Sequence, residues 1–398
     1  MFAVSENVKS KVDTIQKVAF VVGAIGLVAG FVMMGLNKKE FFQSYLMSFI
    51  YFFAIGLGSL ALLMIQHVAG GAWGFSTRRL LEAGSRTLML LAVLFVPLVV
   101  LGLPDLYEWA KPDALKDKII EMKSSYLNVP FFMVRQVIFF SIWIGLALVL
   151  TNLSKKEDES ADPSLGWWFT AISGPGLVVF AVTAGLTSVD WAMSVDVHWY
   201  SSMYPVLFAF GCILSAMIFH TVAMILLYDD GGVVKSGNLE KFIGKNYLRD
   251  MGSFILGFII FWAYLTFSQY LLIWSANLKE EVTYFLNRQT GGWHTIAMIL
   301  AIGHFVIPFL FLLSRDSKRV RKNLLYIACF LLLMRFFDYL YLLGPSFSPK
   351  HFKIAISHFA CFAGIGGLWL GFFLYQWKLM PPIAVRDPRL LQEPIHGV

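Results

Sequence analysis

Residues 41–69 read FFQSYLMSFIYFFAIGLGSLALLMIQHVA, a stretch that contains no Asp, Glu, Lys or Arg. About 20 apolar residues are enough for a helix to cross the roughly 30 Å hydrocarbon core of a bilayer. A helix is favoured there because backbone amides in lipid must find their hydrogen-bond partners within the segment. We therefore predict a transmembrane helix in this stretch.

The remaining sequence has the same character. Hydrophobic residues make up 58% of the 398-residue chain and charged residues only 14%, whereas soluble domains carry about 25% charge. Ten apolar runs are long enough to span a membrane, and they lie near residues 15–36, 41–69, 86–104, 129–153, 168–190, 200–228, 250–275, 293–314, 322–343 and 352–377. The first run has no small-residue cleavage pattern after it, so we expect it to remain in the mature chain. The predicted fold class is an all-α integral membrane protein with ten transmembrane helices.

A weak internal repeat divides these spans. Met64-Ile65-Gln66-His67 reappears as Met217-Ile218-Phe219-His220, and an amphipathic segment follows in each half, at 115–126 and at 278–285. We expect one polytopic domain over residues 1–398, with two four-helix bundles at 41–190 and 200–343, two peripheral helices, and a tail at 378–398. An even number of spans per repeat relates the bundles by an axis along the membrane normal. The alternative is a chance likeness between two amphipathic segments.

Lys and Arg are distributed unequally between the two sides of the predicted bundle. Segments on the side of the N-terminus hold 20 of them, and segments on the other side hold 10. By the positive-inside rule, both termini are predicted in the cytoplasm and the connector near 190–202 outside. This bias and anionic lipid explain the net charge of +7, so we predict membrane lipid and no nucleic acid as the charged partner.

The three cysteines, Cys212, Cys329 and Cys361, all fall within predicted spans. No two of them have metal-ligand spacing, and the sequence lacks the Cys-x-x-Cys-His pattern of covalent haem attachment. An iron–sulfur cluster generally needs four ligands. We therefore predict no metal site, no cluster and no covalently bound cofactor on this chain.

Polar side chains occur at successive depths of the predicted bundle. The connector SVDWAMSVDVHWYSS at 188–202 places Asp196 and His198 at the outer edge. Further inward we expect, in order, Arg135, Asp190, Asp338 and His358, then Arg335 and His304, and finally His67 and His220 toward the cytoplasm. Ionisable side chains within a membrane are costly and usually mark a functional path. We predict a proton relay, or a pair of half-channels, through Asp190, Asp196, His198, His67, His220, His304, Arg335 and Asp338.

Structural alternatives exist for parts of this path. Arg335 and Asp338 lie three residues apart on one helix face and can simply neutralise each other. His67 and His220 can hydrogen-bond to backbone or lipid headgroups instead of relaying protons. If these two histidines face each other at matched depth, they can instead hold a b-type haem.

Prolines are expected to distort several spans. Ser173-Gly174-Pro175-Gly176 is predicted to interrupt the fifth span and to free carbonyls for a water path, while Pro97 and Pro308 lie within the third and eighth. The alternative is a packing kink, which membrane helices tolerate.

Several of these features together resemble a known family. The connector Asp190-Trp191-x-Met193-Ser194-x-Asp196-x-His198-Trp199-x-Ser201, the Ser173-Gly174-Pro175-Gly176 motif and the tail Asp387-Pro388-Arg389-Leu390 are similar to the F subunit of bacterial alternative complex III. That complex is a quinol:electron acceptor oxidoreductase, and the subunit belongs to the NrfD-like, or polysulfide-reductase-like, membrane family. The resemblance covers essentially the whole chain.

The resemblance implies a non-redox subunit of a bacterial inner membrane that contributes a proton path or a coupling element. The implied partners are a homologous C-type membrane subunit, a periplasmic iron–sulfur protein, multihaem c-type cytochromes and, as a further candidate, a terminal oxidase. Haem c and iron–sulfur clusters are then expected on those partners only. NrfD-like proteins bind quinone near the outer face through Arg, Asp or His, and the candidates here for a quinone or quinol pocket are Arg135, Asp190, Asp338 and His358.

Two other functions fit the same sequence. A secondary transporter also uses parallel repeats, a broken helix and buried ionisable residues, although the ninth span has no Gly or Pro break to mirror that of the fifth. A purely structural anchor would use its buried charges only to hold the partner subunits of a redox complex.

Overall fold

The computed structural model describes residues 6–71, 73–160, 162, 164–228 and 244–384, and regular structure in this part of the chain is entirely helical. It contains ten helices long and apolar enough to cross a membrane, which confirms the predicted all-α, multi-pass fold. Seven of the spans are single helices: α1 (Glu6–Leu36), α2 (Lys38–Ala69), α7 (Val129–Glu159), α8 (Ser164–Trp191), α9 (Met203–Leu227), α11 (Lys245–Ala276) and α17 (Ile356–Lys378). Helix α16 (Arg321–Phe347) also forms a span by itself, so eight of the ten spans are each built on one long helix.

The other two spans are built from shorter helical pieces. One consists of α3 (Trp73–Arg86), α4 (Leu88–Pro97), the π-helical segment η1 (Leu98–Gly102) and α5 (Leu103–Leu106). The other consists of α13 (Trp293–Ile299), the π-helical segment η5 (Leu300–Val306) and α14 (Ile307–Leu313). Short helices outside the spans are η2 (Glu108–Ala110), η3 (Ala114–Lys116), α6 (Lys118–Lys123), α12 (Lys279–Arg288) and α15 (Arg315–Arg319), while η4 (Met193–Val195) ends the span that α8 begins.

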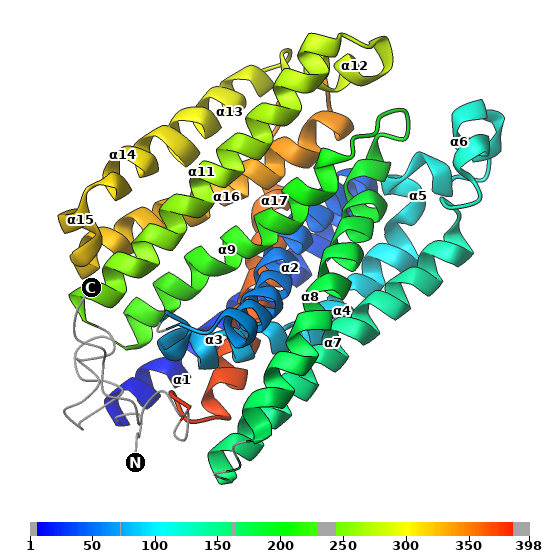
Figure 1. Cartoon of the computed structure of the whole chain (residues 1–398). Coiled ribbons are helices and arrows are strands. Elements are labelled where there is room, and N and C mark those ends of the chain that lie inside the picture. The colour runs from blue at the N-terminus through cyan, green and yellow to red at the C-terminus, as the bar shows by residue number, and fades with distance from the viewer. Residues whose placement is uncertain (1–5, 72, 161, 163, 229–243, 385–398) are drawn as a thin grey trace.

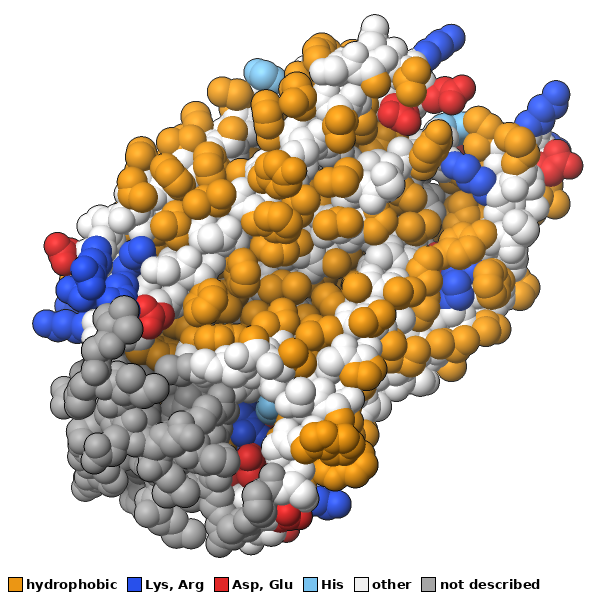
Figure 2. Space-filling model, viewed as in Figure 1, with side chains coloured by type: hydrophobic (Ala, Val, Ile, Leu, Met, Phe, Trp, Pro, Cys, Tyr) orange, Lys and Arg blue, Asp and Glu red, His pale blue; other side chains and the backbone are white. Residues whose placement is uncertain are grey.

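The helices lie side by side with their ends gathered at two faces of the molecule (Figure 1). We call the end that holds the start of α1 and the end of α17 the terminal face, where Lys378 and Asp13 form an ion pair (2.5 Å). The opposite end holds α6, α12 and the connector at 192–202, and we call it the connector face. Hydrophobic side chains cover the flank of the bundle between these two ends (Figure 2), as expected for a surface in contact with acyl chains.

Helix α2 forms the core of the molecule, and nearly every residue from Phe41 to Gln66 is buried. A helix that is apolar on all sides is stable only when protein or lipid surrounds it completely, and here α9, α17, α3 and α8 pack around it. Its contact with α9 is close, because a Cβ built at Gly58 would lie 2.0 Å from the carbonyl oxygen of Cys212. The first helices of the two predicted bundles therefore pack directly on each other; the division into two bundles stays a prediction.

Helix α1 is attached mainly through α17. Glycines allow the two backbones to approach, since a Cβ at Gly26 would lie 2.4 Å from the backbone nitrogen of Gly364. The opposite side of α1 exposes Ile25, Val28 and Val32. Small residues at one face and bulky apolar residues at the other are typical of a helix at the lipid boundary.

The predicted interruption of the fifth span is wrong, because α8 is helical through Gly174, Pro175 and Gly176. A proline removes only one backbone donor, and the rest of a lipid-embedded helix retains its bonds because no other partner is near. The irregular backbone occurs instead in the third and eighth spans, where η1 directly follows Pro97 and η5 ends two residues before Pro308.

Two further expectations need correction. The third span was predicted to begin at residue 86, but helix α3 begins at Trp73 and the apolar span at Ser76, because the charged side chains of α3 are paired inside the protein. The segment 115–126 is not one amphipathic helix: Asp117 caps the short α6, and Leu115 is exposed. The second segment does form a helix, α12. The tail motif at 387–390 and four of the counted cations, Lys235, Lys241, Arg386 and Arg389, lie outside the described residues.

Candidate functional site

The Asp190 carboxylate is fully buried at the connector end of α8. Arg135 on α7 donates from Nη2 to Oδ1 (2.8 Å) and from Nε to Oδ2 (3.0 Å), and Gln136 donates to Oδ2 (2.9 Å). The Gln136 side chain in turn accepts from the Trp191 indole (2.9 Å), and the Tyr126 ring covers the guanidinium at 3.9 Å. This bidentate, charge-assisted pair closes the carboxylate off and fixes the start of the connector.

Asp196 and His198 lie beyond this pair, on the connector face. His198 is half exposed and its Nε2 lies 3.2 Å from Oδ2 of Asp117. Asp196 lines a small pocket of about 180 Å³ together with Lys123. Lys123 donates to the Val197 carbonyl (2.5 Å), and burial lowers its pKa, although the nearby Asp196 carboxylate acts in the opposite direction. These contacts attach the connector to the loop before α7.

A second buried group, which we call the central polar cluster, consists of Gly211, Ser215, Arg335, Asp338 and Tyr339. Arg335 on α16 is 1% exposed and donates to Ser215 Oγ (2.9 Å) and to the Gly211 carbonyl (3.1 Å), both on α9. It also forms an ion pair with Asp338 one turn further along α16. The Ser215 hydroxyl lies 3.3 Å from the hydroxyl of Tyr339. The ion pair that the spacing of Arg335 and Asp338 predicts is therefore present, and α9 supplies the remaining contacts.

His304 lies in the π-helical segment η5 and is 0% exposed. Neither ring nitrogen has a hydrogen-bond partner among the described residues. Its ring lies 4.1 Å from that of Trp262 on α11. Trp262 also lines a cavity of about 680 Å³, as do Asp338 and Arg288. The orphaned imidazole and the central polar cluster are thus neighbours of one internal space.

The two histidines predicted toward the cytoplasm lie at different depths. His220 on α9 is buried, and its Nε2 lies 2.7 Å from Ser59 Oγ on α2. His67 stacks on the Phe169 ring with 4.5 Å between centroids. Ser59 and His67 are eight residues apart on α2, about 12 Å along the axis. The b-type haem reading needs facing histidines at one depth, so this geometry is against it.

The sequence analysis missed a charged network at the terminal ends of α3 and α7, which we call the terminal-face network. Its members, all largely buried, are Arg78, Arg79, Glu82, Ser154, Glu157 and Asp158. Arg78 contacts Glu82 (3.2 Å) and Glu157 (2.6 Å), and Arg79 contacts Glu82 (2.8 Å) and Asp158. The spacing of Arg78, Arg79 and Glu82 at i, i+3 and i+4 was the available signal. Arg78 and Arg79 are two of the 20 Lys and Arg residues from which the sequence predicts the topology.

The terminal-face network continues toward His220. Ser85 donates to the Glu82 carbonyl (2.9 Å). The next contact is made by Gly84, where an added Cβ would lie 2.5 Å from Ser59 Oγ and 2.9 Å from His220 Nε2. Helix α3 therefore carries the terminal-face network near its start and lies against the Ser59–His220 pair at Gly84.

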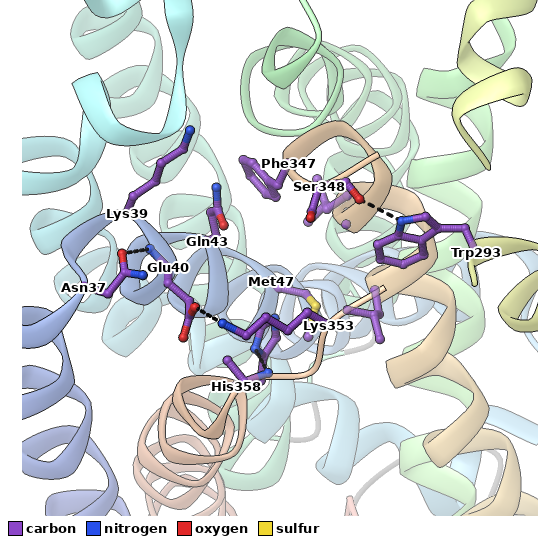
Figure 3. A pocket seen from close by; sticks show the side chains of 14 residues that line it. Asn37, Lys39, Glu40, Gln43, Met47, Trp293, Phe347, Ser348, Lys353 and His358 are labelled. Atoms are coloured by element: carbon purple, nitrogen blue, oxygen red, sulfur yellow. Dashed lines mark hydrogen bonds and ion pairs between the residues drawn. The ribbon is translucent and has the colours of Figure 1, made fainter. Parts of the chain in front are cut away.

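His358, the remaining candidate, lies in a pocket of about 330 Å³ on the connector face (Figure 3). Its Nδ1 accepts from the Ala355 amide (3.2 Å) and lies 3.1 Å from Ser44 Oγ. Figure 3 shows Lys353 extending across the pocket to Glu40, with 2.7 Å between Nζ and Oε2. Two of the three charged side chains at this pocket, Glu40 and Lys353, are thus paired with each other; the third is Lys39.

The four candidates for a quinone pocket are not brought together. Arg135 and Asp190 bind each other, His358 lines the pocket of Figure 3, and of the four only Asp338 lines the 680 Å³ cavity. The structure therefore places these four residues at three separate positions: the Arg135–Asp190 pair, the cavity that Asp338 lines and the pocket that His358 lines. Comparison with protein-family models and with curated proteins found no match to this chain.

Proposed function

We propose that this chain is a membrane subunit of a quinol-oxidising complex of the alternative complex III type, without redox centres of its own, and that it provides two proton half-channels. The terminal-side half runs from the terminal-face network to His220. The connector-side half runs from the 680 Å³ cavity through Asp338 and Arg335 to Ser215. In this proposal the terminal face is cytoplasmic and the connector face is periplasmic, in a bacterial inner membrane.

The observation that carries the proposal is the position of α3, which holds Arg78, Arg79 and Glu82 of the terminal-face network and contacts the Ser59–His220 pair at Gly84. Protons move only between groups within hydrogen-bond reach, directly or through water. The terminal-face network contains titratable carboxylates, and Gly84 abuts the hydrogen-bonded pair of Ser59 and His220. A buried network of this kind is costly unless every charge is paired, and here each arginine contacts more than one carboxylate.

Helix α9 relates the two half-channels. It presents Ser215 to the central polar cluster and His220 to Ser59, and these residues are five positions apart, about 7.5 Å along the axis. Within the described part of the chain, Ser215 and His220 bond to different neighbours, so their own hydrogen bonds do not link the two halves. A gap of this kind is what a coupled transporter of protons requires, since an open channel would dissipate the gradient.

The partners are proposed from the resemblance: a C-type membrane subunit, an iron–sulfur protein and multihaem c-type cytochromes. Native purification tests this directly, because a reduced-minus-oxidised spectrum detects c-type haem in a co-purifying cytochrome. A chain that purifies alone and colourless from gently solubilised membranes would contradict this part of the proposal.

The proton function is tested with His220→Gln in the assembled complex, which removes the titratable ring and keeps a hydrogen-bonding group. The matched control is His351→Gln, since His351 is exposed on the connector face. Quinol oxidation and proton uptake are followed together in liposomes. We expect quinol oxidation to continue and the proton yield per electron to fall only in His220→Gln. An unchanged yield would refute the half-channel.

A structural role remains the second candidate, and the sealing of Asp190 favours it. Its carboxylate accepts three hydrogen bonds from Arg135 and Gln136 and is 0% exposed. A group so fully bound serves to fix the connector, and we therefore leave Asp190 out of the proposed path. A secondary transporter is less well supported, because the broken helix expected in the fifth span is absent: α8 is continuous through Pro175.

A further inference from the structure

The turn that joins the eighth and ninth spans at the terminal face contains helix α15 and is rich in positive charge. Residues 315–322 contain one carboxylate, Asp316, and five cations: Arg315, Lys318, Arg319, Arg321 and Lys322. Figure 2 shows Lys and Arg side chains gathered at the end of the molecule where Figure 1 places α15. We call Arg315, Lys318, Arg319 and Lys322 the α15 patch. Like charges this close repel one another, so the patch favours an anion beside it.

Lys318 is the unusual member of the patch, because only 8% of it is exposed. Its stem packs against α11, where a Cβ added at Gly252 would lie 2.8 Å from Lys318 Cγ. Its ammonium donates to the hydroxyl of Ser253 (3.1 Å), which is an exposed residue of the same helix. A long cationic side chain can bury its stem and keep its charge near water. The ammonium of Lys318 therefore lies close to the surface where α11 and α15 meet.

The groups around Lys318 compensate its charge only in part. Burial and the neighbouring Arg249 lower its pKa, whereas the Asp250 carboxylate acts in the opposite direction. Asp250 is itself paired with Arg249, with 2.8 Å between Oδ1 and Nη2, and the Ser253 hydroxyl is neutral. A buried cation is costly when its counter-charge is incomplete. An anion bound at this junction would therefore stabilise the charged form of Lys318.

Arg319, the next residue along α15, has a donor to offer such an anion. Its Nη2 donates to Asn246 Oδ1 on α11 at the long distance of 3.4 Å. Its Nε is buried and has no hydrogen-bond partner among the described residues. Buried donors are almost always satisfied in folded proteins, and a guanidinium can present two N–H groups to one phosphate. Arg319 is thus suited to bind a phosphate at the surface of α15.

Apolar side chains next to the patch indicate the source of this phosphate. Leu310 and Leu313 on α14 and Val320 after α15 are exposed on the flank of the bundle. An acyl chain that lies along α14 would place its headgroup level with α15, because α14 ends at Leu313 and α15 begins at Arg315. A soluble phosphate has no apolar part to bury against these side chains. The neighbouring surface therefore favours a lipid.

We propose that the α15 patch binds an anionic phospholipid. Arg319 donates to the headgroup phosphate, Lys318 supplies a second positive charge, and the acyl chains extend along Leu310 and Leu313. Cations at the edge of a membrane attract anionic headgroups, and each Lys or Arg near the surface strengthens the binding. The proposal does not depend on which side of the membrane the terminal face occupies, or on the proton function.

The test is a titration of the full-length chain in detergent with dioleoylphosphatidylglycerol, followed by native mass spectrometry, which resolves each bound lipid. Dioleoylphosphatidylcholine has the same tails and no net charge, so it is the comparison lipid. Glycerol phosphate and a peptide of ten glutamates are added as soluble competitors. We expect the anionic lipid to bind at least about fivefold more tightly than the zwitterionic one, and neither competitor to displace it at equal concentration.

Three variants locate the site. Arg319→Gln removes the guanidinium, and Lys318→Met removes the ammonium while keeping an unbranched stem. The control is Lys156→Gln, which removes an exposed cation at the terminal end of α7. We expect Arg319→Gln and Lys318→Met each to weaken binding about fivefold, the value of one cation at the membrane surface. Arg319→Lys should restore part of the affinity, because the charge returns without the two-pronged contact.

Equal affinity for the two lipids would overturn the proposal, as would displacement by glycerol phosphate or by the acidic peptide at equal concentration. A loss in Lys156→Gln as large as that in Arg319→Gln would also overturn it, because the attraction would then be spread over the whole terminal face. Arg319→Gln keeps the test decisive if Lys318→Met does not fold, since Arg319 is only partly buried. A changed proton yield in His220→Gln has no bearing on these outcomes.

Discussion

The first prediction concerns the contribution of the buried Arg135–Asp190 ion pair to the free energy of unfolding. Removing one partner of a buried ion pair leaves an uncompensated charge and typically costs about 3–5 kcal/mol of the free energy of unfolding. Arg135→Met removes the positive charge and two of the three hydrogen bonds that the Asp190 carboxylate accepts, leaving only that from Gln136. We therefore expect Arg135→Met to destabilise the chain by about 3–5 kcal/mol.

Removing both charges should cost much less. Replacing a buried pair by apolar side chains is often close to neutral, so Arg135→Met combined with Asp190→Leu should recover at least about 2 kcal/mol relative to the sum of the single variants. Lys116→Met is the matched control. Lys116 and Asp113 also lie 2.8 Å apart, but both are about 80% exposed, and such pairs are worth about 0–1 kcal/mol.

Equilibrium unfolding in mixed micelles, followed by tryptophan fluorescence, gives the free energy of unfolding of the unchanged chain, of both single variants, of the double variant and of the control. A loss in Arg135→Met no larger than that in Lys116→Met would show that the buried pair does not stabilise the fold. Additive losses in the double variant would show that the two side chains act separately, and the structural role assigned to Asp190 would be wrong.

Three glycine and proline predictions follow from the packing. Gly26→Leu should destabilise the chain by at least about 1–3 kcal/mol by forcing α1 off α17, whereas Gly35→Leu, with nothing within 4 Å of its Cβ, should be near neutral in the same unfolding assay. Gly84→Ala places a methyl group within 3 Å of Ser59 and His220 and should lower the proton yield of the assembled complex in liposomes. Pro175→Ala should leave stability, assembly and proton yield unchanged, because α8 is already continuous; a lost proton yield would restore the broken-helix prediction.

Hydropathy was sufficient to predict the ten spans, because each lipid-crossing helix needs its own run of apolar residues and no tertiary information. The ion pair of Arg335 and Asp338 was also predictable, since both residues lie on one helix face. The long-range contacts were not. Nothing in the sequence around His220 indicates that its ring meets Ser59, which lies 161 positions earlier.

The errors have a common physical cause. Charged residues near a span end were read as loop residues, but Arg78 and Arg79 are about 2% exposed because carboxylates on α3 and α7 neutralise them. The same reading placed Arg288 in a loop, although it is buried beside the large cavity. Sequence alone does not show which residue lies next to a charged side chain. That neighbour determines whether the free-energy cost of burying the charge is offset.

The central position of α2 has a consequence for biogenesis. This helix is made second, yet two of the helices that cover it, α9 and α17, begin only at Met203 and Ile356. During synthesis its aromatic and small residues must therefore face acyl chains or an insertion factor until the last span has entered the bilayer. A chain truncated before α17 would therefore leave the side of α2 that α17 covers exposed to lipid.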